Sequence, residues 1–98
     1  MRKINLQPYD FSDGEPYDVK GSIVSLLFSG HLNLGYRQLL EHEHIAQKIE
    51  ASNSLVLLEE TEYREVLNAV ETFTGYGRPD VEFISRITEA PEVEVKEA

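Results

Sequence analysis

The segment ETEYREVLNAVETFT, residues 60–74, decides the fold class of this chain. Its apolar side chains recur at spacings of three, four and seven residues, which is the pattern of an α-helix with one buried face. Acidic residues and a hydroxyl group occupy its first turn, where they stabilise the positive end of the helix dipole. The segment therefore predicts an amphipathic helix, whose buried face comprises Tyr63, Val66, Leu67 and Val70.

Other segments of the chain carry the same helical spacing. One of them follows Asp18, which can cap a helix start, and precedes Gly30, a residue suited to a C-terminal cap. The last one begins at Pro79-Asp80 and stops before Pro91, because proline favours the first turn of a helix and cannot continue one. The predicted helices span residues 19–29, 34–51, 60–74 and 80–89.

Short β-strands are predicted between and outside the helices. The interval 8–18 is rich in proline, glycine and aspartate and is expected to be a turn-rich loop. The apolar run 55–58 is either a buried strand or the start of the next helix, and the alternating tail is expected to pair with another strand or to fray. The strands lie near residues 3–7, 55–58 and 92–96, which makes the predicted fold mainly α with a small β component (α+β).

Composition limits the classes of protein to consider. A chain of 98 residues with 41% hydrophobic content fits one domain, residues 1–98, with frayed termini. Its 18 acidic and 9 basic residues give a net charge of −9, which disfavours nucleic acid and anionic membranes as partners. Cysteine is absent, which excludes disulfide bonds and thiolate metal sites. No apolar run approaches the ~20 residues of a membrane span, and the polar N-terminus lacks a signal-peptide pattern, so a cytoplasmic protein is expected.

The stretch LEHEHI, residues 40–45, has the residue types of a metal site. In a helix, however, residues two apart point about 200° away from each other, so His42 joins the apolar face and His44 projects elsewhere. A helical zinc site needs histidines four residues apart. We therefore predict no metal ligands here, although an extended backbone would bring both imidazoles onto one face, where His31 could join them.

Patterns typical of catalysis are missing from the sequence. A cysteine nucleophile, a Gly-x-Ser-x-Gly elbow and a P-loop are all absent. Paired carboxylates such as Glu41 with Glu43 and Glu59 with Glu60 lie in polar stretches, where solvated helix surfaces explain them. The sequence thus predicts no catalytic residue and no cofactor, and an enzyme is the less favoured class.

The loop GYGR, residues 75–78, is the predicted contact with a partner. Its candidate residues are Tyr76 and Arg78, because tyrosine and arginine are enriched at interface hot spots. The competing interpretation is structural: Tyr76 folds back onto the core and Arg78 pairs with a nearby carboxylate such as Asp80. In that case the contact surface is sought on the apolar residues of helix 34–51.

Two segments, YDVKGSIVSLLF and LLEETEYREVLNAVETFTGYGRPDVEFISRITEAPEVEV, resemble small proteins encoded by bacteriophages and prophages. The resemblance implies a non-enzymatic interaction or assembly protein with a protein partner or a homo-oligomeric state, located in the bacterial host cytoplasm or the virion. One alternative is an acidic inhibitor or DNA mimic that binds a basic host protein. A third hypothesis is a small metal-dependent enzyme that uses His31, His42 or His44 with Glu41 or Glu43.

Overall fold

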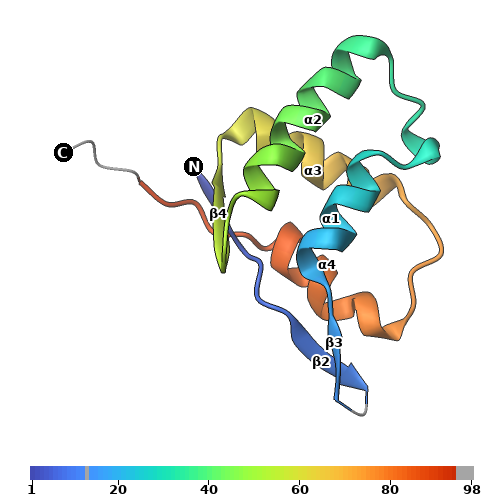
Figure 1. Ribbon diagram of the computed structural model, residues 1–98, viewed down its shortest axis with the longest axis vertical. Coiled ribbons are helices and arrows are strands. Elements are labelled where there is room, and N and C mark those ends of the chain that lie inside the picture. The colour runs from blue at the N-terminus through green and yellow to red at the C-terminus, as the bar shows by residue number, and fades with distance from the viewer. Residues whose placement is uncertain (13, 95–98) are drawn as a thin grey trace.

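The computed structural model describes residues 1–12 and 14–94 of the chain (Figure 1). Over these residues it confirms the α+β fold class, with α-helices as the main component and short strands beside them. The helices are α1 (Val19–Leu27), α2 (Tyr36–Glu50), α3 (Glu60–Thr72) and α4 (Val81–Thr88), with short 3-10 turns η1 (Gly30–Leu32) and η2 (Arg78–Asp80). The strands are β1 (Arg2–Asn5), β2 (Tyr9–Ser12), β3 (Glu15–Tyr17) and β4 (Leu55–Leu58).

Strands β1 and β4 form an antiparallel pair, so the run 55–58 is a strand and not the start of a helix. Ile4 lies opposite Val56 in this pair, and both side chains are buried. The first strand was expected to reach residue 7 but ends at Asn5. The Asn5 side chain accepts a hydrogen bond from the backbone N–H of Gln7 at 2.9 Å, which turns the chain out of the strand.

The C-terminal segment pairs with the N-terminal strand. Glu92 forms an isolated antiparallel bridge with Arg2, and the backbone N–H of Val93 donates to the Met1 carbonyl at 2.7 Å. The pairing predicted for this tail is therefore present as far as the structure describes it. Residues 95 and 96 of the predicted strand lie outside the described residues.

The prediction of a turn-rich loop over residues 8–18 was wrong, because β2 and β3 form an antiparallel hairpin there. Tyr9 and Tyr17 lie opposite each other and stack with ring centroids 4.8 Å apart. The Tyr9 hydroxyl also donates to the Pro79 carbonyl and accepts from the Phe83 N–H, which docks the hairpin on the start of α4. Cross-strand aromatic contacts thus outweigh the turn-forming composition.

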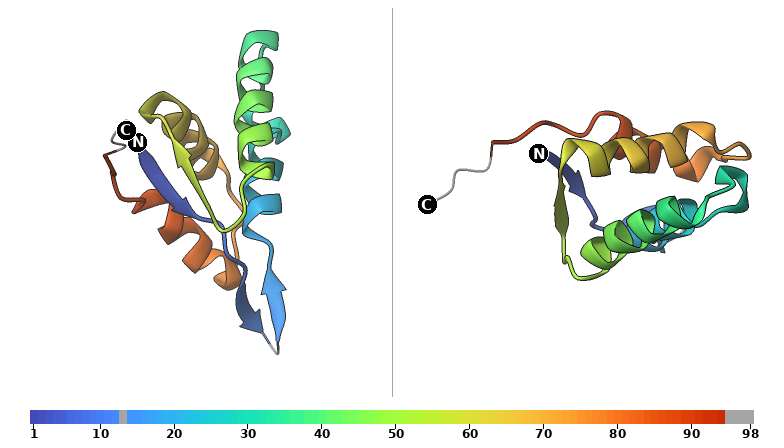
Figure 2. Two further views of the ribbon diagram at one scale, coloured as in Figure 1. Left: turned by 60° about the vertical axis from the view of Figure 1, so that its left-hand side comes forward. Right: turned by 90° about the horizontal axis from the view of Figure 1, so that it is seen from above.

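Helix α1 lies at the centre of the fold and packs against both α2 and α3 (Figures 1 and 2). Asp18 caps its start as predicted, accepting a hydrogen bond from the Gly21 N–H at 3.0 Å. The prediction that Gly30 caps the end of this helix was wrong. The helix ends at Leu27 with Phe28 as the capping residue, and Gly30 begins the η1 turn.

The buried face of α3 is slightly rotated from its predicted position. Tyr63, Val66 and Val70 are buried as expected, but Leu67 is only partly buried and Ala69 is buried in its place. The buried face packs against both α1 and α4, and Leu67 lies at its edge. On α2 the predicted apolar face is correct for Ile45, Ala46 and Ile49 but wrong for Leu39, whose side chain is 46% exposed.

We expect stability to follow these burial differences. Ile23 of α1 is almost fully buried, so Ile23→Ala should lower the free energy of unfolding by about 2–5 kcal/mol. Leu67→Ala should cost roughly half as much, because part of its side chain already contacts water. Urea titration measures both losses. The control is Asn68→Ala at an exposed position, which should change the free energy of unfolding by less than about 0.5 kcal/mol. Equal losses at positions 23 and 67 would contradict the assigned face.

Candidate functional site

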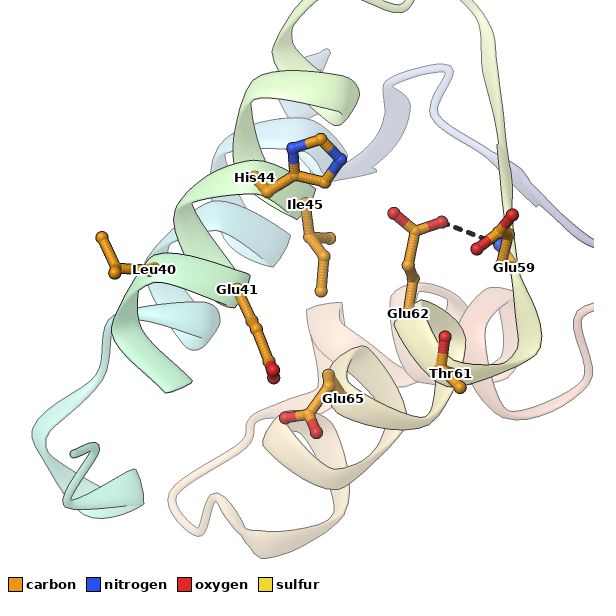
Figure 3. Close-up of a pocket in the computed structure, with 8 residues that line it drawn as sticks. All are labelled: Leu40, Glu41, His44, Ile45, Glu59, Thr61, Glu62 and Glu65. Carbon is orange, nitrogen blue, oxygen red and sulfur yellow. Dashed lines mark hydrogen bonds between the residues drawn. The ribbon is translucent and has the colours of Figure 1, made fainter. Parts of the chain in front are cut away.

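Helices α2 and α3 both pack against α1 and diverge from each other (Figure 2). A groove lies between them (Figure 3). The groove has a volume of about 490 Å³ and is open to solvent. Figure 3 shows Glu41 and Glu65 facing each other across it, with Ile45 between the two helices. The lining residues are Leu40, Glu41, His44 and Ile45 from α2, and Glu59, Thr61, Glu62 and Glu65 from the start of α3.

A buried imidazole joins the two walls beneath the groove. His42 is 1% exposed; its Nδ1 lies 2.6 Å from the Leu27 carbonyl oxygen and its Nε2 lies 2.8 Å from Glu65 Oε2. A carbonyl can only accept, so Nδ1–H donates to it, while Nε2 shares a hydrogen bond with the Glu65 carboxyl group. The ring therefore links the end of α1 to α2 and α3.

A second bridge joins α2 to the start of α3. Lys48 donates to Glu62 at 2.9 Å, and Glu62 also accepts from the Glu59 backbone N–H, which completes a cap at the start of α3. Burial opposes ionisation of Glu62, but the hydrogen bonds from Lys48 and Glu59 together outweigh it and lower the pKa of this carboxyl group. Glu62 is therefore a charged structural bridge and not a proton donor.

Two other carboxylates of the groove have no such partner. Glu41 and Glu59 are exposed, and neither forms a salt bridge with any described residue. They lie on opposite walls, with the exposed His44 and Thr61 near them. An open groove with free carboxylates on both sides is suited to binding cationic groups.

The outer surface of α2 carries exposed apolar side chains next to this groove. Tyr36 is 70% exposed and Leu40 is 64% exposed; because they are four residues apart, they lie on one face of the helix. We call these two residues the outer stripe. Leu40 also lines the groove, so the stripe and the groove form one continuous surface.

The three histidines occupy separate places. His42 is buried under the groove and His44 is on its rim, while His31 contacts the Ala69 carbonyl at 3.2 Å and the Phe73 ring. The opposed orientation predicted for His42 and His44 is confirmed by their different surroundings. Within residues 1–12 and 14–94, no group of three or more His, Asp or Glu side chains is arranged to hold a metal ion.

The predicted contact residues Tyr76 and Arg78 are separated by the fold. The Tyr76 hydroxyl donates to the Val70 carbonyl at 2.8 Å and its ring packs edge-on against Phe73, so Tyr76 folds back onto the core. Burial raises the pKa of its hydroxyl group. Arg78 is exposed beside another shallow groove, near Phe11 of the hairpin. Their contact with a partner stays a prediction.

The role of Glu65 was not foreseen from the sequence. A histidine on an apolar face needs hydrogen-bond partners, and this was the available signal. Its partners, however, are 15 and 23 positions away in the chain, and nothing in the helical period identifies them.

Comparison of the chain with protein-family models, with curated proteins and with solved structures gave no match. Among the described residues, no helix has both the length and the apolar character needed to cross a membrane. The function is therefore argued from the groove and the outer stripe.

We expect the His42 bridge to stabilise the fold. His42→Ala leaves the Leu27 carbonyl without its partner and opens a cavity, which should lower the free energy of unfolding by about 2–4 kcal/mol. The exposed neighbour offers a control, because His44→Ala should change it by less than about 0.5 kcal/mol. Urea titration of both variants checks this. Equal stabilities would show that the bridge contributes nothing.

The LEHEHI stretch is expected to bind no divalent metal. The purified chain should contain less than stoichiometric zinc by elemental analysis, and added zinc should leave its melting temperature unchanged. Zinc that survives purification, and is lost in a His42→Ala/His44→Ala double variant, would contradict this expectation.

Proposed function

We propose that the chain is a non-enzymatic interaction or assembly domain that binds a protein partner through α2. The observation that supports this most strongly is the outer stripe. Tyr36 and Leu40 are large apolar residues on the solvent side of a helix, and they add nothing to the buried core. Exposed apolar side chains that lie together on one surface mark interaction sites more often than isolated ones do.

The position of the stripe also favours a docking role. The N-terminal half of α2 projects past the neighbouring helices (Figure 2), so its outer side is accessible to a second molecule. Leu39, on another side of the same helix turn, is 46% exposed. A partner that covers this end of α2 would remove all three side chains from water, which is the main driving force for association.

The biological setting that we propose is a phage or prophage, with the protein in the bacterial host cytoplasm or the virion. The support for this setting is the resemblance of residues 17–28 and 57–95 to small phage-encoded proteins. The partner is then a protein of the virion or of the host, or a second copy of the chain.

A second candidate function is an acidic inhibitor or DNA mimic that occupies a basic surface of a host protein. The carboxylates on both walls of the groove favour it, since Glu41 and Glu59 are free to meet cationic side chains. This candidate differs in one measurable way. Duplex DNA would displace such an inhibitor from its target, whereas an assembly partner would stay bound.

The outer stripe can be tested with a Tyr36→Ser/Leu40→Ser double variant. A tagged chain is purified from its native host after cross-linking, and the isolated chain is sized by light scattering. We expect a stoichiometric partner or an oligomer with the wild type, and binding weakened by about tenfold or more in the variant. Val81→Ser is the matched control, because Val81 is also an exposed apolar helix residue, at 59%.

Two outcomes would contradict the proposal. One is a monomeric wild-type chain that retains no stoichiometric protein. The other is association that the double variant preserves while Tyr76→Ala/Arg78→Ala abolishes it without loss of melting temperature, since that result would place the interface at residues 75–78.

A further inference from the structure

We propose that the surface formed by the outer stripe and the α2–α3 groove binds a lysine- or arginine-rich amphipathic helix of a partner protein. This inference rests on the proposed function and specifies the chemistry of the partner. It depends on the shape of the surface, on the charges that are free in the groove, and on the charges that a second copy would bring.

The shape of the surface favours a helix as the bound element. Both walls of the groove are helical, and Tyr36 and Leu40 repeat at the spacing of one helical turn. Rows of side chains at this spacing pack against the equivalent rows of another helix. A groove of about 490 Å³ accepts a few side chains but not a whole helix, which is about 10–12 Å wide. The partner therefore lies along the outer stripe and inserts one row of side chains.

The free charges of the groove specify what that row contains. Glu62 and Glu65 already have partners within the chain, Lys48 and His42 respectively. Glu41 and Glu59 have no salt-bridge partner within the described chain, and they stand on opposite walls. Lysine or arginine side chains of a partner would complete both sites, while its apolar side chains would cover Leu40.

A second copy of the chain fits this surface poorly. Each copy carries a net charge of −9, so two copies repel each other. Several of its cations are also bound internally, as Lys20 donates to the Ser52 carbonyl and Arg86 pairs with Glu82. A basic partner meets no such repulsion and is attracted at long range.

The experiment uses two labelled peptides of about four helical turns, ~14 residues, that share leucines at helical spacing. One peptide carries lysine at all the remaining positions, and its counterpart carries glutamate there. Fluorescence anisotropy titrations measure their binding to the full chain. We expect binding of the lysine peptide only, and weaker binding as the salt concentration rises from about 50 to about 300 mM.

Charge-neutral variants then locate the binding site. Glu41→Gln/Glu59→Gln removes the two free carboxylates and should weaken binding of the lysine peptide about five- to tenfold. Glu50→Gln/Glu71→Gln removes the same total charge from exposed positions of α2 and α3 outside the groove, and should change it less than about twofold. Circular dichroism verifies that each variant keeps its fold.

The other outcomes each overturn the inference. Equal losses in the two variants would show attraction to net charge alone, and equal binding of both peptides would show an apolar surface without charge preference. If neither peptide binds, the basic helix is excluded. Binding of the native partner is measured separately, in the Tyr36→Ser/Leu40→Ser experiment. The proposed function can therefore survive the failure of this inference.

Discussion

The arrangement of the three packed helices depends on one buried imidazole. His42 is the only buried polar or charged residue among those whose burial the structure describes, so it must find its hydrogen bonds inside the protein. It finds them on the Leu27 carbonyl and on Glu65, which ties the end of α1 and the middle of α3 to α2. The bridge between α2 and α3 runs through the His42 and Glu65 side chains, and Glu65 also lines the groove between these two helices.

The guanidinium group of Arg2 joins β1 to the start of α3 and to the segment that follows α4. Arg2 forms two hydrogen bonds with Glu60, donates to the Ala90 carbonyl at 2.8 Å and lies over the Tyr63 ring. The hydrogen bond from Arg2 lowers the pKa of the Glu60 carboxyl group. Because folding lowers this pKa, the contribution of the pair to stability is fully present above the ordinary pKa of a glutamate. It is lost as the pH falls from there through the lowered pKa of Glu60. Arg2 thus holds the start of α3, whereas His42 holds its middle.

The sequence predicts the helices well because each has its own apolar period, and it places His42 inside for the same reason. Its failures have a different origin. The hairpin of residues 9–17 depends on stacking between two tyrosines across the strands, and the exchange of Leu67 for Ala69 in the core depends on where α1 lies. The groove was not foreseen at all, since it requires the angle between α2 and α3. Contacts between distant residues are not encoded in a local period.

The residues that maintain the groove are distinct from those available to a partner. Two pairs of side chains bridge α2 and α3: His42 with Glu65, and Lys48 with Glu62. Four other residues contribute no buried apolar contact or ion pair to the described fold, namely Tyr36, Leu40, Glu41 and Glu59. A chain that needed α2 only as a packing element would gain solubility from polar residues at positions 36 and 40. Departures from the pattern that the fold requires are expected at functional sites. The outer stripe is such a departure, and a bound partner would give its apolar side chains the burial that the core does not provide.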